Sequence, residues 1–184
     1  MSTSPHDPDA VLAFWFDEAS PQQWWAKSDD FDRLIRQRFG AVHAAAAQGE
    51  LFDWRASASG RLAEIIVLDQ FSRNLYREQA QAFACDAMAL ALAQTAVALQ
   101  ADRELPVPRR TFLYMPYMHS ESPVIHAVAL SLFATPGLEG NLAFEVKHKD
   151  IIDRFGRYPH RNAALGRRST PQELAFLATP GSSF

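Results

Sequence analysis

The sequence is poor in the residues that mark several large classes of protein. Cys85 is the only cysteine among 184 residues, which excludes an internal disulfide and a zinc site built on paired cysteines. Basic residues are not in excess, because 18 Lys and Arg stand against 21 Asp and Glu, giving a formal net charge of -3. General nucleic-acid binders carry a basic surplus that neutralises phosphates, so we expect no nucleic-acid partner.

Long apolar runs are missing as well. No stretch approaches the roughly 20 apolar residues of a membrane span, and the opening MSTSPHDPDA has neither the basic nor the apolar region of a signal peptide. We therefore expect no membrane partner and a cytoplasmic location. The hydrophobic fraction of 48% and the charged fraction of 21% are those of ordinary globular proteins, and the length fits one domain over residues 1–184.

Strand signals are also lacking, whereas helix signals recur along the chain. No apolar alternation typical of strands and no Asn-Gly hairpin is found. Capping residues, several of them followed by proline, precede apolar residues at helical spacing. About eight helices are expected, near residues 7–18, 28–48, 59–77, 79–101, 109–118, 122–135, 140–155 and 170–177. Short links between them favour an all-α fold of antiparallel helix pairs.

Polar side chains interrupt the apolar stripe of the segment 59–77. The stripe is continued by Asp69 and then Arg73, where core residues would be expected. Three further polar residues lie beside them: Gln70, Asn74 and Arg77. The i, i+4 spacing of Asp69 and Arg73 suits a local ion pair, so a structural network and a ligand-binding cleft both remain open. Asp86, which also has apolar neighbours, is expected to pair with a basic residue of 59–77.

A second polar cluster follows Pro116 and contains His119 and Glu121. Its H-x-E order occurs in zinc deaminases, but the paired cysteines of those enzymes cannot exist here. A metal site formed by these two residues and His148 has no supporting local motif such as H-E-x-x-H. We therefore expect no metal and no cofactor.

A third cluster lies between Lys147 and Arg168, where seven Lys or Arg residues stand against two Asp. His148 falls on the apolar face of the helix 140–155 and therefore occupies a core position. The other polar candidates follow the helix stop at Gly156 on an irregular loop: Arg157, His160, Arg161 and Asn162. A solvated basic face is one interpretation. The other is an anion site, because arginine binds carboxylate or phosphate oxygens in pairs and histidine can transfer a proton.

Three stretches give the chain a family resemblance: LDQFSRNLYR, MPYMHSES and RFGRYPHRNAALGRRSTPQEL. With them the chain resembles, over nearly its whole length, a bacterial family known as domain of unknown function 924. That family is similar in fold to tetratricopeptide-like proteins, which implies antiparallel helix pairs stacked in a right-handed superhelix. It has no settled activity. This chain has Ser72 where the family commonly has Pro, and Tyr158 where Phe is usual.

Three hypotheses of function follow. The first is a polar pocket on a concave face that binds an anionic small molecule or a peptide carboxylate. Its residues would be Asp69, Gln70, Arg73, Asn74, Arg77, His119, Glu121, His148, Arg157, His160, Arg161 and Asn162. The second is a hydrolase or transferase for an anionic substrate, with His119 or His160 as general base. The third is a scaffold stabilised by buried ion pairs.

The sequence decides neither the oligomeric state nor whether the protein is an enzyme. Under the binding hypothesis, replacing Arg73 or Arg161 with alanine should abolish binding and leave thermal stability nearly unchanged.

Overall fold

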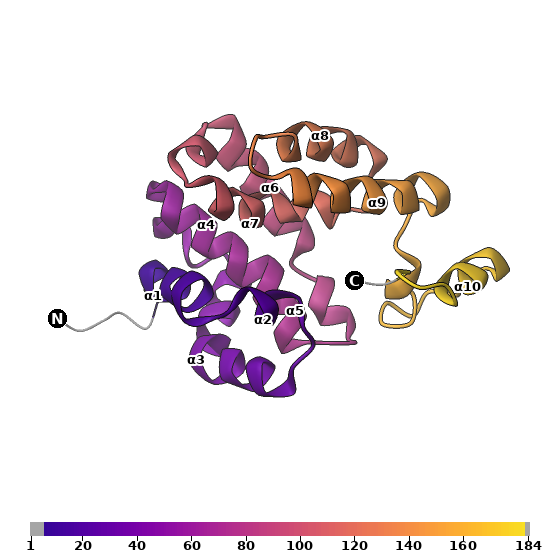
Figure 1. The fold of residues 1–184 in the computed structure, drawn as a ribbon. Helices are drawn as coiled ribbons and strands as arrows, with labels where there is room; N and C mark the ends of the chain where they lie inside the picture. The colour runs from indigo at the N-terminus through magenta and orange to yellow at the C-terminus, as the bar shows by residue number, and fades with distance from the viewer. Residues whose placement is uncertain (1–5, 183–184) are drawn as a thin grey trace.

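A computed structural model describes residues 6–182 and contains helices and no strands in that range (Figure 1). The expectation that the N-terminus carries no signal peptide falls partly on residues 1–5, which lie outside the described residues. The α-helices are α1 (Pro8–Ala13), α2 (Pro21–Trp25), α3 (Asp29–Ala47), α4 (Ala58–Ile66), α5 (Ser72–Leu75), α6 (Asp86–Ala98), α7 (Val107–Met118), α8 (Pro123–Phe133), α9 (Glu139–Phe155) and α10 (Pro171–Leu177). The short 3-10 and π-helical segments are η1 (Phe14–Glu18), η2 (Phe52–Ala56), η3 (Val67–Phe71), η4 (Ala80–Phe83), η5 (Ala101–Glu104) and η6 (Pro159–Arg161). The all-α prediction is therefore confirmed.

Local signals in the sequence set most helix ends. The backbone N–H of Asp9 donates to the Asp7 side chain at 3.0 Å, which caps α1. Thr170 and Glu173 form a capping box at the start of α10, with the Glu173 N–H donating to the Thr170 hydroxyl at 3.2 Å. Gly156 ends α9 in the left-handed conformation, at φ +68°, which glycine adopts without steric cost.

The centre of the molecule is the continuous helix formed by α4, η3 and α5. It packs against α1, α3, α6 and α7 (Figure 1). Its apolar side chains have no exposed surface, among them Leu62, Ile65, Ile66, Leu68 and Phe71. Because these neighbours pack on different sides, the helix is buried on more than one face. Its π-helical part, η3, is wider than the flanking turns and contains Asp69 and Gln70.

The alanine-rich segment departs from its prediction of one helix over 79–101. It begins as the 3-10 turn η4, and α6 starts only at Asp86, whose carboxylate is bound by Arg73 from the central helix. Contacts with the rest of the fold thus outweigh the helix propensity of alanine.

The same segment bears on the membrane expectation. Ala80–Ala98 is long and apolar enough to cross a membrane by length and composition alone, with a mean hydropathy of 1.2. One face of α6 is nevertheless fully buried in the core through Ala89, Ala93 and Ala96. A core helix meets the same criterion, so this feature alone does not indicate a membrane span.

The C-terminal third places a polar loop beside Asp86 at the start of α6. α7, α8 and α9 are consecutive neighbours in space, and α10 lies at the edge of the molecule beside η6 (Figure 1). A small second core anchors the loop through Ile151, Ile152 and Tyr158. Stacking of these helices into a tetratricopeptide-like right-handed superhelix stays a prediction.

One glycine is required by a close contact at the start of α4. A Cβ atom on Gly60 would lie 2.0 Å from the Trp54 carbonyl oxygen, whereas a Cβ on Gly40, within α3, would meet nothing within 4 Å. We expect Gly60→Ala to lower the free energy of unfolding by about 2–3 kcal/mol, since backbone must shift to admit the methyl group. Gly40→Ala should raise it by about 0.5–1 kcal/mol through helix propensity. Urea denaturation measures the change in the free energy of unfolding for each variant. If both variants changed it in the same direction, the close contact between Gly60 and the Trp54 carbonyl would be contradicted.

Candidate functional site

Asp69 lies at the centre of the candidate site and has no exposed surface. Its Oδ1 atom lies 2.7 Å from Nδ1 of His119 and 3.1 Å from Nη1 of Arg73, and its Oδ2 accepts a hydrogen bond from Gln70 at 2.6 Å. Burial would raise the pKa of Asp69, but Arg73 and His119 outweigh it and lower this pKa to about 2. The carboxylate is therefore ionised at neutral pH.

Arg73 connects Asp69 to a second carboxylate. Its Nη1 and Nη2 donate to the two oxygens of Asp86 at 3.0 and 3.1 Å, and Nη1 also donates to the Asp69 carbonyl at 2.7 Å. The expected pairing of Asp86 with a basic residue of the central helix is confirmed. Paired, two-point contacts of this kind fix the position of a guanidinium group.

Arg161 reaches the same carboxylate from the loop after α9. Its Nη1 lies 3.4 Å from Oδ2 of Asp86, and its guanidinium carbon lies 4.7 Å from the ring centre of Phe83 and 4.5 Å from that of Tyr158. The Nε atom is buried, and no side chain or carbonyl among residues 6–182 accepts a hydrogen bond from it. Burial, followed by the nearby Arg73, lowers the pKa of Arg161 to about 10, so it remains positively charged at pH 7.

Three histidines surround this group of charges. Burial, with the positive charge of Arg73, lowers the pKa of His119 despite the neighbouring Asp69. Burial lowers the pKa of His148 to about 3, and burial together with Arg161 lowers that of His160 to about 4. The ring of Tyr158 lies 5.8 Å from that of His148 and 5.6 Å from that of His160. At pH 7 the imidazoles are therefore neutral, and the two arginines carry the positive charge of the site.

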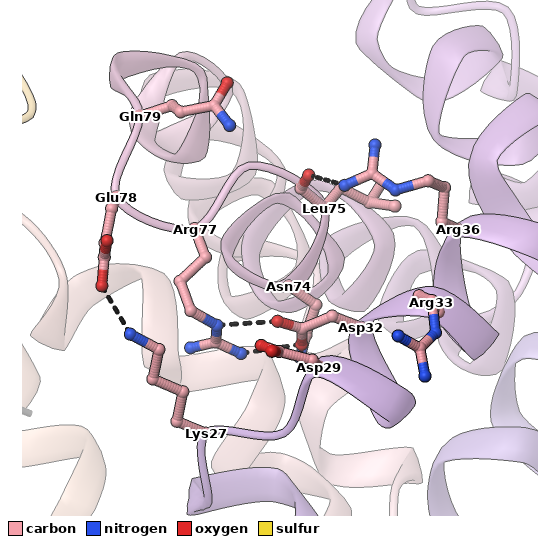
Figure 2. A pocket seen from close by; sticks show the side chains of 10 residues that line it. All are labelled: Lys27, Asp29, Asp32, Arg33, Arg36, Asn74, Leu75, Arg77, Glu78 and Gln79. Atoms are coloured by element: carbon pink, nitrogen blue, oxygen red, sulfur yellow. Dashed lines mark hydrogen bonds and ion pairs between the residues drawn. The ribbon is translucent and has the colours of Figure 1, made fainter.

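Part of the predicted pocket lies elsewhere. Asn74 and Arg77 turn away from Asp69 and bind the carboxylate of Asp32 on α3, with Arg77 donating to both oxygens at 2.7 Å (Figure 2). They line an open hollow of about 310 Å³ in which Lys27 is paired with Glu78 (Figure 2). The predicted polar residues therefore do not all line one pocket, because Asn74 and Arg77 lie in this separate hollow. The charges of this hollow are largely neutralised by one another.

The remaining candidates stabilise the loop that carries Arg161. Glu121 accepts two hydrogen bonds from Arg167, at 2.6 and 2.8 Å, and one from the backbone N–H of Tyr158. Asn162 accepts a hydrogen bond from Arg167 at 2.9 Å. Arg157 donates to both carboxylate oxygens of Glu173 at 2.7 and 2.9 Å. With Glu121 bound to Arg167, the arrangement does not form the metal site considered for Glu121 with two histidines.

The structure thus brings together six of the twelve predicted residues: Asp69, Gln70, Arg73, His119, His160 and Arg161, with His148 behind them in the core. The site predicted from the sequence did not include three neighbours of Arg161: Asp86, Phe83 and Tyr158. For Asp86 and Phe83 the available signal was the position of Asp86 one turn beyond Phe83 on an apolar face. For Tyr158 the only signal was its place in the loop sequence RFGRYPHRN.

Comparisons with known proteins agree on the family. The family model described as "Bacterial protein of unknown function (DUF924)" matches residues 11–181. The solved structure of the protein of unknown function ATU0120 from Agrobacterium tumefaciens is similar, with a TM-score of 0.88 and 36% sequence identity. The similarity covers 93% of this chain and 96% of that one. No curated protein matches the chain. Since the family model spans almost the whole sequence, the chain belongs to the DUF924 family of bacterial proteins of unknown function.

Proposed function

We propose that this protein binds a small anion, a carboxylate or phosphate group of its ligand, between Arg161 and Arg73. The observation that carries the proposal is the state of Arg161. Its side chain is only 6% exposed, yet its one hydrogen bond within residues 6–182 is the long contact to Asp86. A buried guanidinium group with unused donors is costly, and an anion supplies the acceptors that it lacks.

The electrostatics of the site favour an anion over a cation. Asp86 is held on both oxygens by Arg73 and meets Arg161 only through one long contact of 3.4 Å, and Asp69 is enclosed by three other donors, so Arg161 is only weakly paired. His119, His148 and His160 are neutral at pH 7, so they do not offset the positive charge of the arginines. Arg73, Asp86 and His119 keep 21%, 21% and 13% of their side chains exposed, which leaves a polar edge that a small ligand can reach.

The test is to titrate the purified protein with inorganic phosphate and with acetate. Binding is measured by isothermal titration calorimetry at constant ionic strength. Acetate represents a carboxylate of either a small molecule or a peptide end. Arg161→Met should weaken binding at least about tenfold, since a charge-assisted hydrogen bond contributes about 1.5–3 kcal/mol. Arg154→Met removes the same charge from an exposed position at the end of α9 and should leave affinity unchanged.

Arg161→Met should also fold normally, because Asp86 retains Arg73 and methionine fills much of the same volume between the rings. From the sequence, replacing Arg73 was expected to leave thermal stability nearly unchanged. The structure changes this expectation, because removing Arg73 would leave Asp69 and Asp86 without their main partner. The scaffold hypothesis makes the opposite prediction for binding. If the wild-type protein binds neither phosphate nor acetate, the polar groups form a structural network and the proposed function is wrong.

A further inference from the structure

The imidazole of His119 is oriented by the ionised Asp69. Because the carboxylate can only accept, the short contact of 2.7 Å requires that Nδ1 of His119 carries the proton. The lone pair of the neutral ring therefore resides on Nε2, while the contact to Asp69 is made through Nδ1. The second oxygen of Asp69 is held by Gln70, so the carboxylate cannot rotate away.

This imidazole lies beside the arginines of the anion site. Nδ1 of His119 and Nη1 of Arg73 both contact the same oxygen atom, Oδ1 of Asp69, so the ring and the guanidinium group are immediate neighbours. The backbone of His119 is also fixed, because its N–H donates to the Met115 carbonyl at 2.9 Å at the end of α7. An anion held by Arg73 would thus lie beside the His119 ring, whose side chain keeps 13% of its surface exposed.

Charged and titratable groups from five other elements influence this ring: Asp69 on η3, Arg73 on α5, Asp86 on α6, His148 on α9 and His160 on η6. Burial and Arg73 together lower the pKa of His119, which keeps Nε2 unprotonated at pH 7. The carboxylate of Asp69 would stabilise the imidazolium ion that forms when Nε2 accepts a proton. An aspartate plays the same part for histidine in serine proteases.

We infer that His119, positioned by Asp69, is a general base whose Nε2 accepts a proton from a hydroxyl group or water molecule next to the bound anion. The inference rests on the proposed function, because it takes the substrate to be an anionic molecule held by Arg73 and Arg161. In the step, the O–H bond breaks, its electron pair stays on oxygen, and the proton forms a bond with Nε2. The oxygen gains a negative charge, and a positive charge forms on the imidazole beside Asp69.

The test uses diethyl pyrocarbonate, which acylates unprotonated, accessible imidazole nitrogen, on the full-length protein at pH 7. Mass spectrometry then gives a rate for each histidine. His119 should react at least tenfold faster than His126, an internal control whose ring is fully buried and hydrogen bonded through both nitrogens. In Asp69→Asn the pH profile of His119 reactivity should move to lower pH, since the negative charge that favours protonation is gone.

Protection by phosphate separates this inference from the proposed function. Inorganic phosphate should slow modification of His119 at least fivefold in the wild-type protein and should have no effect in Arg161→Met. If His119 reacts no faster than His126, the inference is overturned whether or not Asp69→Asn folds. If calorimetry shows phosphate binding but His119 is not protected, the inference fails and the proposed function stands. If phosphate does not bind, the proposed function fails and the inference fails with it.

Discussion

The free energy of unfolding is expected to fall by about 3 kcal/mol between pH 7 and pH 5, because the folded protein holds His148 and His160 in their neutral forms. Their folded pKa values, about 3 and about 4, lie well below the ordinary value of 6.5. Below pH 6.5 the unfolded chain takes up protons that the folded chain excludes. The stability that these two histidines contribute is therefore fully present above pH 6.5 and is lost as the pH falls toward 4. The loss is at most about 1.4 kcal/mol per pH unit for each histidine.

Urea denaturation at pH 7, 6 and 5 measures this loss. His148, which is 5% exposed, should account for about 2 kcal/mol of it, and the partly exposed His160 for the rest. In His148→Leu the loss of stability between pH 7 and pH 5 should fall to about 1 kcal/mol. Ile151→Val, a nearby core change that costs about 1 kcal/mol, should lower stability equally at each pH. A wild-type change below 1 kcal/mol would show that the folded protein protonates these rings without penalty.

Arg73→Met is expected to destabilise the fold by about 3–5 kcal/mol, the usual cost of removing one partner from a buried ion pair. The change would leave the fully buried Asp69 with His119 and Gln70 only. Asp86 would keep the single 3.4 Å contact to Arg161. Asp69 and Asp86 would then be largely shielded from water, with too few hydrogen bonds and positive charges to offset the cost of burying their negative charge. The midpoint and slope of urea denaturation at pH 7 give the change in free energy.

Arg161→Met is the matched control, because the same substitution at the other arginine of the site leaves Asp86 fully paired with Arg73. It should cost less than about 1 kcal/mol. Adding Asp86→Asn to Arg73→Met should recover part of the loss, since one unpaired charge is removed. A loss of under 1 kcal/mol for Arg73→Met, with no recovery in the double variant, would show that the ion pairs add little to stability.

Much of the fold follows from local patterns. The capping residue Asp7 and the Thr170–Glu173 capping box act over three residues or fewer, so the sequence shows them directly. The beginning of α6 could not be located in this way. Every residue from Gln79 to Asp86 is compatible with a helix by propensity, whereas Asp86, where α6 starts, is bound by Arg73, 13 positions earlier in the chain.

The candidate site was predictable in part. Asp69 and Arg73 were found because an apolar stripe in a buried helix makes a charged residue conspicuous. Asn74 on the same helix and Arg77 in the turn after it were assigned to the same site, but the π-helical turn and the end of α5 direct them to Asp32. The rotation added by such a turn cannot be read from residue spacing.

The sequence by itself determined the all-α class, the buried position of the central helix, its polar interruption at Asp69 and Arg73, and the family. These features depend on periodicity and capping within single helices. Only the tertiary structure decided which arginine meets which acid, as in Arg161 with Asp86 across 75 positions and Arg167 with Glu121 across 46. The physical reason is that a long arginine side chain can reach many carboxylates, and packing alone selects one of them.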